Sequence, residues 1–141
     1  MTGPESGVRS SAAKRGKVLI VDDDPVVLRV IREWLERAGF EVLTRGEALG
    51  TTGAVAVDKP DVILLDYRMP EINGEALAHL LEINPTTNKS AIIFHSSEDL
   101  AFLQERATTL GITGAIPKTD NEKMFLAQFE RLFARAKKAR S

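Results

Sequence analysis

The chain contains no cysteine among its 141 residues, which excludes a disulfide framework and a thiolate metal site. No apolar stretch approaches the roughly 20 residues that a membrane-spanning helix requires. The N-terminus also lacks the apolar segment of a signal peptide, and no repeat of a fixed period is visible. We therefore expect a cytoplasmic protein without a membrane partner.

Charge is nearly balanced overall but unevenly distributed. The formal net charge is −1, with +3 on residues 1–17 and +5 on residues 131–141, which leaves −9 on the part between them. An acidic body argues against a nucleic-acid-binding surface, because such surfaces are basic. It suits a site that holds a divalent cation.

The length of the chain fits one domain, flanked by two short ends. Residues 1–16 are rich in Gly, Ser, Pro and charge, which predicts a flexible N-terminal tail. We expect the globular domain at residues 17–136. Residues 137–141 form a basic C-terminal end, whose charges we interpret as complementing a helix dipole.

The stretch at residues 62–74, V-I-L-L-D-Y-R-M-P-E-I-N-G, organises the chain. Its apolar residues run without a break up to Asp66, which is typical of a strand buried on both faces. Pro70 and Gly74 then predict a loop before a helix. A carboxylate at the carboxyl end of such a strand lies where open α/β sheets place their chemistry.

Strands and helices are expected to alternate along the whole globular part. The predicted strands are residues 17–21, 40–44, 62–65, 91–95 and 114–116, and the predicted helices are residues 25–38, 47–58, 74–83, 98–110 and 120–138. This (βα)5 pattern predicts an α/β domain with a parallel sheet and helices on both faces. Trp34, Leu77, Leu80 and Leu81 are expected to face the core.

Polar side chains follow the predicted strands at the point where each strand ends: Asp22, Asp23, Asp66, Ser96 and Lys118. Because the carboxyl ends of parallel strands share one edge of the sheet, we expect these groups to gather there. Three carboxylates favour a hard cation such as Mg²⁺. Zinc is disfavoured without thiolates or a suitably spaced His pair.

A carboxylate beside Mg²⁺ and a lysine is a suitable nucleophile for phosphoryl transfer, with an acyl phosphate as the product. Mg²⁺ would cover one phosphoryl oxygen, the Lys118 ammonium another and the Ser96 hydroxyl a third. Asp24 precedes Pro25, and we expect it mainly to cap the following helix.

Three features are found together in this chain: V-D-D-D-P after a strand, L-L-D-Y-R-M-P-E-I-N-G, and the strand-end Ser and Lys. In these features the chain resembles the receiver domain of two-component response regulators over about residues 17–136. The resemblance implies a flavodoxin-like, doubly wound five-stranded parallel sheet in the order 2-1-3-4-5. It implies a phosphorelay in which a histidine kinase or a histidine phosphotransfer protein phosphorylates Asp66.

The resemblance also implies a role for each group at the site. Mg²⁺ would be held by Asp22, Asp23, Asp66 and the backbone carbonyl of Arg68, while Ser96 and Lys118 would contact the phosphoryl group. We expect a stand-alone receiver that is a monomer or weak homodimer and not an enzyme. It would signal to a downstream protein through its fourth helix, fifth strand and fifth helix.

Two departures from the family pattern favour an alternative, an interaction module with a weakened or absent switch. Ala115 stands where the family usually has an aromatic residue, and Thr119 follows Lys118 where the family usually has proline. A cis bond between Lys118 and Thr119 would cost about 2.5–4 kcal/mol, so we expect this loop to differ. Pro117 is compatible with an edge strand.

Three further residues have competing interpretations. His95 is expected to be packed and hydrogen-bonded rather than a phosphate carrier, and His79 to lie on a helix surface. Arg68 could reach the phosphoryl group or Glu98 and tune the lifetime of the phosphate, or its side chain could simply be solvated.

An enzyme is the third class that the sequence leaves open. D-D-D-P also resembles the D-x-D of haloacid-dehalogenase-type phosphatases, with Asp22 as nucleophile and Asp24 as acid. That family needs a further acidic pair late in the chain. Residues 111–141 offer only Asp120, Glu122 and Glu130, none of which ends a convincing strand.

Overall fold

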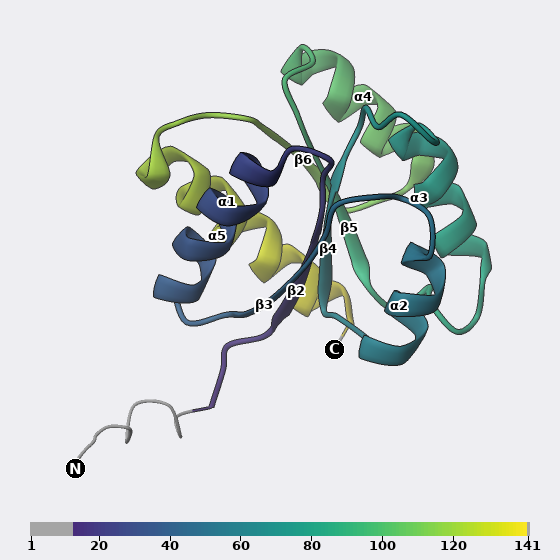
Figure 1. Ribbon diagram of the computed structural model, residues 1–141, viewed down its shortest axis with the longest axis horizontal. Coiled ribbons are helices and arrows are strands. Elements are labelled where there is room, and N and C mark those ends of the chain that lie inside the picture. The colour runs from purple at the N-terminus through teal and green to yellow at the C-terminus, as the bar shows by residue number, and fades with distance from the viewer. Residues whose placement is uncertain (1–12, 141) are drawn as a thin grey trace.

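The structure is a computed structural model that describes residues 13–140, with the side chain of residue 140 excepted (Figure 1). Most of the predicted tail at residues 1–16 therefore lies outside the described residues. No helix within residues 13–140 is both long and apolar enough to cross a lipid bilayer.

The described residues form a parallel five-stranded sheet in the order β3-β2-β4-β5-β6, which is 2-1-3-4-5 in chain order. The strands are β2 (Lys17–Val21), β3 (Glu41–Arg45), β4 (Val62–Asp66), β5 (Ala91–Ser96) and β6 (Gly114–Pro117). The helices are α1 (Pro25–Arg37), α2 (Thr51–Asp58), α3 (Gly74–Ile83), α4 (Leu100–Leu110) and α5 (Glu122–Arg140). The predicted flavodoxin-like (βα)5 fold is thus confirmed.

Helices cover both faces of the sheet, with α1 and α5 on one side and α2, α3 and α4 on the other (Figure 1). Strand β4 lies at the centre, and all of its residues are buried. Its side chains alternate between two apolar clusters, with Leu64 on the α1 and α5 side and Leu65 on the other. This alternation explains why the strand reads as an unbroken apolar run.

Several element boundaries and one core residue differ from prediction. Helix α2 begins at Thr51 rather than residue 47, because Gly50 adopts a left-handed conformation with φ 85°. Leu80 was predicted to face the core, but its side chain is 46% exposed. Leu77 and Leu81, four residues apart, take the buried stripe of α3, and Leu80 lies to one side of it.

The start of α5 and the position of Trp34 follow from local contacts. The Asn121 side chain accepts a hydrogen bond from the Met124 amide at 3.0 Å, so α5 begins at Glu122 rather than residue 120. The helix continues to Arg140 and so includes most of the predicted basic C-terminal end. Trp34 is 8% exposed, which confirms that it packs against the core.

Candidate functional site

Three carboxylates converge at the carboxyl edge of the sheet. Strands β2 and β4 are neighbours, which places Asp22 and Asp23, directly after β2, beside Asp66 at the end of β4. One carboxylate oxygen from each residue lies within 4.8 Å of the others. Asp22 and Asp66 are buried and Asp23 is exposed. Such a cluster of oxygen donors, open on one side, fits a hard divalent cation that keeps part of its water.

Lys118 brings the opposite charge to this cluster. Its Nζ lies 2.8 Å from Asp22 Oδ2 and 3.6 Å from Asp66 Oδ1. The Lys118 backbone N–H donates to the Ser96 carbonyl at 2.8 Å, which fixes the residue just beyond the end of β6. Burial opposes the charge on Lys118, but the hydrogen bond and charge of Asp22 outweigh it, so the pKa is raised and the side chain is cationic.

The carboxyl group of Asp66 is a weaker acid than an ordinary aspartic acid. Burial and then the negative charge of Asp22 raise its pKa to about 6, although the Lys118 charge and the Arg68 amide act in the opposite direction. The negative charges of Asp22 and Asp66 repel each other, and a bound divalent cation would offset this repulsion. The cluster therefore has a physical reason to bind a cation.

The Asp66 pKa predicts how stability depends on pH in metal-free protein. With a native pKa of about 6 and an unfolded value near 3.9, the favourable contribution is complete below about pH 4 and is lost as pH rises through 6. We expect Asp66→Asn to raise the free energy of unfolding at pH 8 by about 1–3 kcal/mol and to flatten the profile between pH 4 and 6. Urea denaturation in EDTA measures this, and a less stable variant at pH 8 would contradict it.

Ser96 ends β5 and lies beside Asp66 and Lys118 in a hollow of about 400 Å³. Its side chain is buried, and the hydroxyl accepts a hydrogen bond from the Glu98 amide at 3.2 Å. The hydroxyl retains its own proton as a donor. The strand-end residues predicted from the sequence are therefore brought to one place.

The loop after Asp66 is held by its own side chains. Arg68 Nε lies 2.6 Å from Glu98 Oε2, so of the two predicted partners the structure pairs Arg68 with Glu98. The Asp66 carboxylate accepts from the Arg68 amide at 3.2 Å. The role of the Arg68 carbonyl as a metal ligand stays a prediction. Asp24 caps α1 by accepting from the Val26 amide at 2.9 Å, as predicted.

A second network beside the site was not predicted. The Tyr67 hydroxyl donates to Glu75, and Arg106 donates to both oxygens of the same carboxylate at 2.7 and 2.9 Å. The Tyr67 ring also packs edge-on against Phe94 and Phe102. These contacts join the residue after Asp66 to α3 and α4. In the sequence, the one indication of this network was that Tyr67 directly follows Asp66.

Gly74 allows close packing of the loop that follows Asp66. A Cβ added at Gly74 would lie 2.8 Å from both the Asp66 carbonyl oxygen and Tyr67 Cα, which are backbone atoms. We expect Gly74→Ala to displace this loop and to lower the free energy of unfolding by about 1–3 kcal/mol.

A matched glycine variant separates this packing effect from helix propensity. Gly53, inside α2, has nothing within 4 Å of an added Cβ. Gly53→Ala should therefore stabilise the protein by up to about 1 kcal/mol. Chemical denaturation measures both variants, and a Gly74→Ala protein as stable as the native chain would contradict the prediction.

The two histidines differ in their surroundings, and the loop at Lys118 contains no cis peptide bond. His79 is exposed on α3, as predicted. His95 is packed, with 2% exposure, but the predicted hydrogen bond is absent at Nε2, which has no partner among the described residues. Burial and then the Lys118 charge lower the His95 pKa to about 3, so the ring is neutral. No peptide bond within residues 13–140 is cis.

The fold and the acidic cluster are those expected of a receiver domain, and comparison with known proteins supports this class. Residues 18–130 match the family described as response regulator receiver domain. The chain belongs to this family.

Some relatives are matched over nearly their whole length and others over a part of it. The chain is 27% identical to a probable chemotaxis protein CheY of Rhizobium etli, over 90% of this chain and 99% of the relative. It is 39% identical to the transcriptional regulatory protein KdpE of Mycobacterium tuberculosis over 40% of this chain, a match that spans 25% of KdpE. A structure of the chemotaxis response regulator CheY4 of Vibrio cholerae superposes with a TM-score of 0.74 at 24% identity, covering 82% of this chain and 97% of that one.

Proposed function

We propose that this protein is a phosphoacceptor receiver of a two-component phosphorelay, with Asp66 as the residue that accepts the phosphoryl group. The observation that carries the proposal is the convergence of three carboxylates with the Lys118 ammonium, which lies 2.8 Å from Asp22 and 3.6 Å from Asp66. Membership in the receiver family supports the same conclusion.

Each side chain has a role that follows from its position. A carboxylate oxygen of Asp66 forms a bond to phosphorus while the bond from phosphorus to the donor breaks. Lys118 pairs with the phosphoryl oxygens once Asp66 is modified, and the Ser96 hydroxyl donates a hydrogen bond to them.

Asp22, Asp23, Asp66 and the Arg68 carbonyl are the proposed Mg²⁺ ligands. The oxygen chemistry and clustering of the three carboxylates fit that ion, and the resemblance to the receiver family adds the Arg68 carbonyl. When bound, Mg²⁺ neutralises negative charge on the phosphoryl oxygens.

The proposed partners are those of the receiver family. A histidine kinase or a histidine phosphotransfer protein supplies the phosphoryl group, and a downstream protein reads the modified state by direct contact. We propose that the globular unit at residues 17–136 acts in the cytoplasm as a monomer or weak homodimer. Neither a nucleic acid nor a membrane is among the proposed partners.

The alternative function is an interaction module that has the fold but little or no switch. Ala115 favours it, because this residue is 2% exposed and has no ring that could change position on phosphorylation. Thr119 after Lys118 favours it as well. Both functions predict protein partners, and they differ in whether Asp66 takes up phosphate.

Phosphate uptake by the native chain decides between the two functions. We expect incubation with Mg²⁺ and acetyl phosphate to add the mass of one phosphoryl group, measured on the intact protein and assigned to the peptide that contains Asp66. The addition should disappear in EDTA. A native chain that stays unmodified under these conditions would leave only the interaction module.

A further inference from the structure

Tyr67 lies between two of the proposed Mg²⁺ ligands, because Asp66 precedes it and Arg68 follows it. The position of the Tyr67 backbone therefore influences how the Asp66 carboxylate and the Arg68 carbonyl lie relative to each other. Gly74 restrains this backbone, because its amide donates to the Tyr67 carbonyl at 2.8 Å. The Tyr67 side chain is 6% exposed and is held by separate contacts.

The ring of Tyr67 packs on the face of the sheet that α3 and α4 cover. It lies edge-on to Phe94 of β5 and to Phe102 of α4, with 5.1 and 5.7 Å between the ring centroids. Edge-on contacts depend on direction, so they fix the orientation of the ring as well as burying it. In this orientation the Tyr67 hydroxyl donates to Glu75, in the first turn of α3.

Glu75 is itself held by Arg106 of α4. The Arg106 guanidinium donates to both carboxylate oxygens, from Nε at 2.7 Å and from Nη2 at 2.9 Å. A two-point contact of this kind fixes the plane of the carboxylate. The hydrogen bond from Arg106 also lowers the pKa of Glu75, so the group that accepts from the Tyr67 hydroxyl is ionised. Hydrogen bonds to an ionised acceptor are stronger than those to a neutral one.

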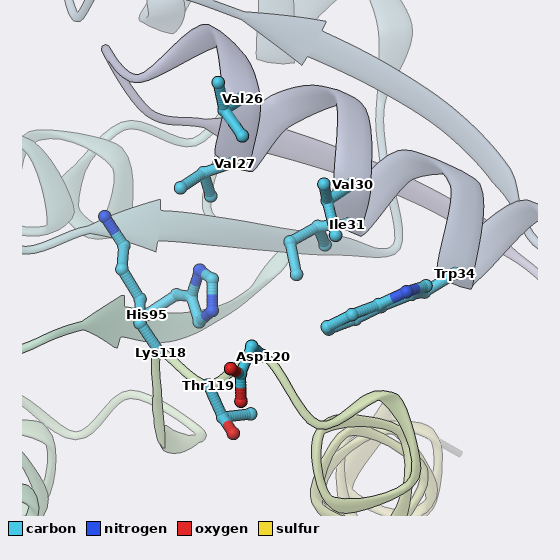
Figure 2. Close-up of a pocket in the computed structure, with 9 residues that line it drawn as sticks. All are labelled: Val26, Val27, Val30, Ile31, Trp34, His95, Lys118, Thr119 and Asp120. Carbon is cyan, nitrogen blue, oxygen red and sulfur yellow. The ribbon is translucent and has the colours of Figure 1, made fainter.

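The opposite face of the sheet is more open at this edge. There a hollow of about 520 Å³ lies between α1 and the loop that joins β6 to α5 (Figure 2). Lys118, Thr119 and Asp120 form the wall opposite α1, and His95 of β5 lies between the two walls. A displacement passes through packed atoms, and a hollow supplies none. The α3 and α4 side is therefore the better-packed support for the loop after Asp66.

We propose that Tyr67, Glu75 and Arg106 are positioning residues for the Mg²⁺ site. Arg106 fixes the Glu75 carboxylate, and this carboxylate holds the Tyr67 hydroxyl. The Tyr67 backbone then keeps the two ligands that flank it within reach of one ion. These roles rest on the proposed function, which supplies the set of ligands. They give α4, a helix that contributes no ligand, a part in supporting the site.

Replacing Arg106 with Gln separates positioning from electrostatics, because the two effects on Mg²⁺ binding have opposite signs. The loss of a positive charge on its own favours a bound cation. The loss of support for Glu75 weakens the site instead. We expect the Mg²⁺ affinity of Arg106→Gln, measured by calorimetric titration, to fall about fivefold, as the loss of one net hydrogen bond would give.

Arg37→Gln is the matched control for this charge change. Arg37 pairs with Glu122 at 3.0 Å, and this exposed pair joins α1 to α5. Its loss removes one positive charge and one ion pair without touching the support of Tyr67. The Mg²⁺ affinity of this variant should not fall.

Tyr67→Phe is the more local test of the same contacts. It keeps the ring between Phe94 and Phe102 and removes only the hydroxyl that reaches Glu75. We expect the Mg²⁺ affinity to fall about fivefold here as well. Because Tyr67→Phe and Arg106→Gln break one chain of contacts, the double variant should bind about as weakly as either single variant. Independent effects would multiply to about 25-fold.

The outcomes distinguish these positioning roles from the proposed function. If the native chain binds no Mg²⁺, the proposed Mg²⁺ site is wrong and the positioning roles are wrong with it. If the native chain binds Mg²⁺ and a folded Tyr67→Phe protein binds it equally well, only the positioning roles are wrong, and a lower stability of that variant to urea in EDTA would show a purely structural network. An affinity of Arg106→Gln at or above the native value, or losses that multiply in the double variant, would also overturn the proposal.

Discussion

Replacing Asp66 with Asn will lower phosphate incorporation from acetyl phosphate by roughly 100-fold or more, which is below detection in an intact mass measurement. The amide nitrogen and oxygen of Asn fill the same space but are poor nucleophiles, and no acyl phosphate can form on them. The other carboxylates of the cluster remain, so Mg²⁺ binding is reduced rather than abolished. Labelling at saturating Mg²⁺ therefore separates the proposed phosphoryl-accepting role of Asp66 from its proposed role as a ligand.

Asp58→Asn is the matched control for this experiment. Asp58 ends α2, and Lys17 at the start of β2 donates to its carbonyl at 2.9 Å, which places it at the amino edge of the sheet. Its variant should take up phosphate like the native chain. If Asp66→Asn were labelled as fully as Asp58→Asn, the nucleophile would lie elsewhere. Asp22, the candidate of the phosphatase interpretation, would then be the next residue to replace.

Replacing Asp22 with Asn will weaken Mg²⁺ binding by about 10–100-fold, measured by calorimetric titration. One full negative charge is lost from a cluster whose oxygens lie within 4.8 Å of each other. Lys118 also loses its nearest carboxylate, at 2.8 Å, and will turn toward Asp66. Phosphate incorporation should then require correspondingly higher Mg²⁺.

Asp24→Asn tests whether this loss depends on position or merely on net charge. Asp24 is two residues away, and its carboxylate caps α1 through the Val26 amide. Asn caps helices about as well as Asp, so the helix should be unaffected. We expect the Mg²⁺ affinity of Asp24→Asn to stay within about twofold of the native value. Equal losses in the two variants would mean that Asp22 is not a ligand.

Much of this architecture could be predicted because it depends on local sequence patterns. The apolar run ending at Asp66 identified the central strand, and the same pattern before Asp22 identified its neighbour. Since parallel strands end at one edge, the sequence also placed Lys118 with these carboxylates. Their distances could not be predicted, because they depend on how far each strand runs and where its last side chain points.

The features that were missed depend on contacts between distant residues. Glu75 and Arg106 are 31 positions apart, and nothing in either helix alone indicates that they pair beside Tyr67. Leu80 was expected to face the core together with Leu77 and Leu81, yet only Leu77 and Leu81 of the three are buried. His95 Nε2 has no partner among residues 13–140, and this is also a tertiary property, because it follows from the apolar neighbours that α1 and α5 supply.

Lys118 is positioned so that its two ends face different surroundings. The ammonium reaches Asp22 and Asp66, while the stem forms part of the wall opposite α1. One flexible side chain therefore connects two places that share no other group. A change at the wall that displaces the stem would therefore also draw the ammonium away from Asp22 and Asp66.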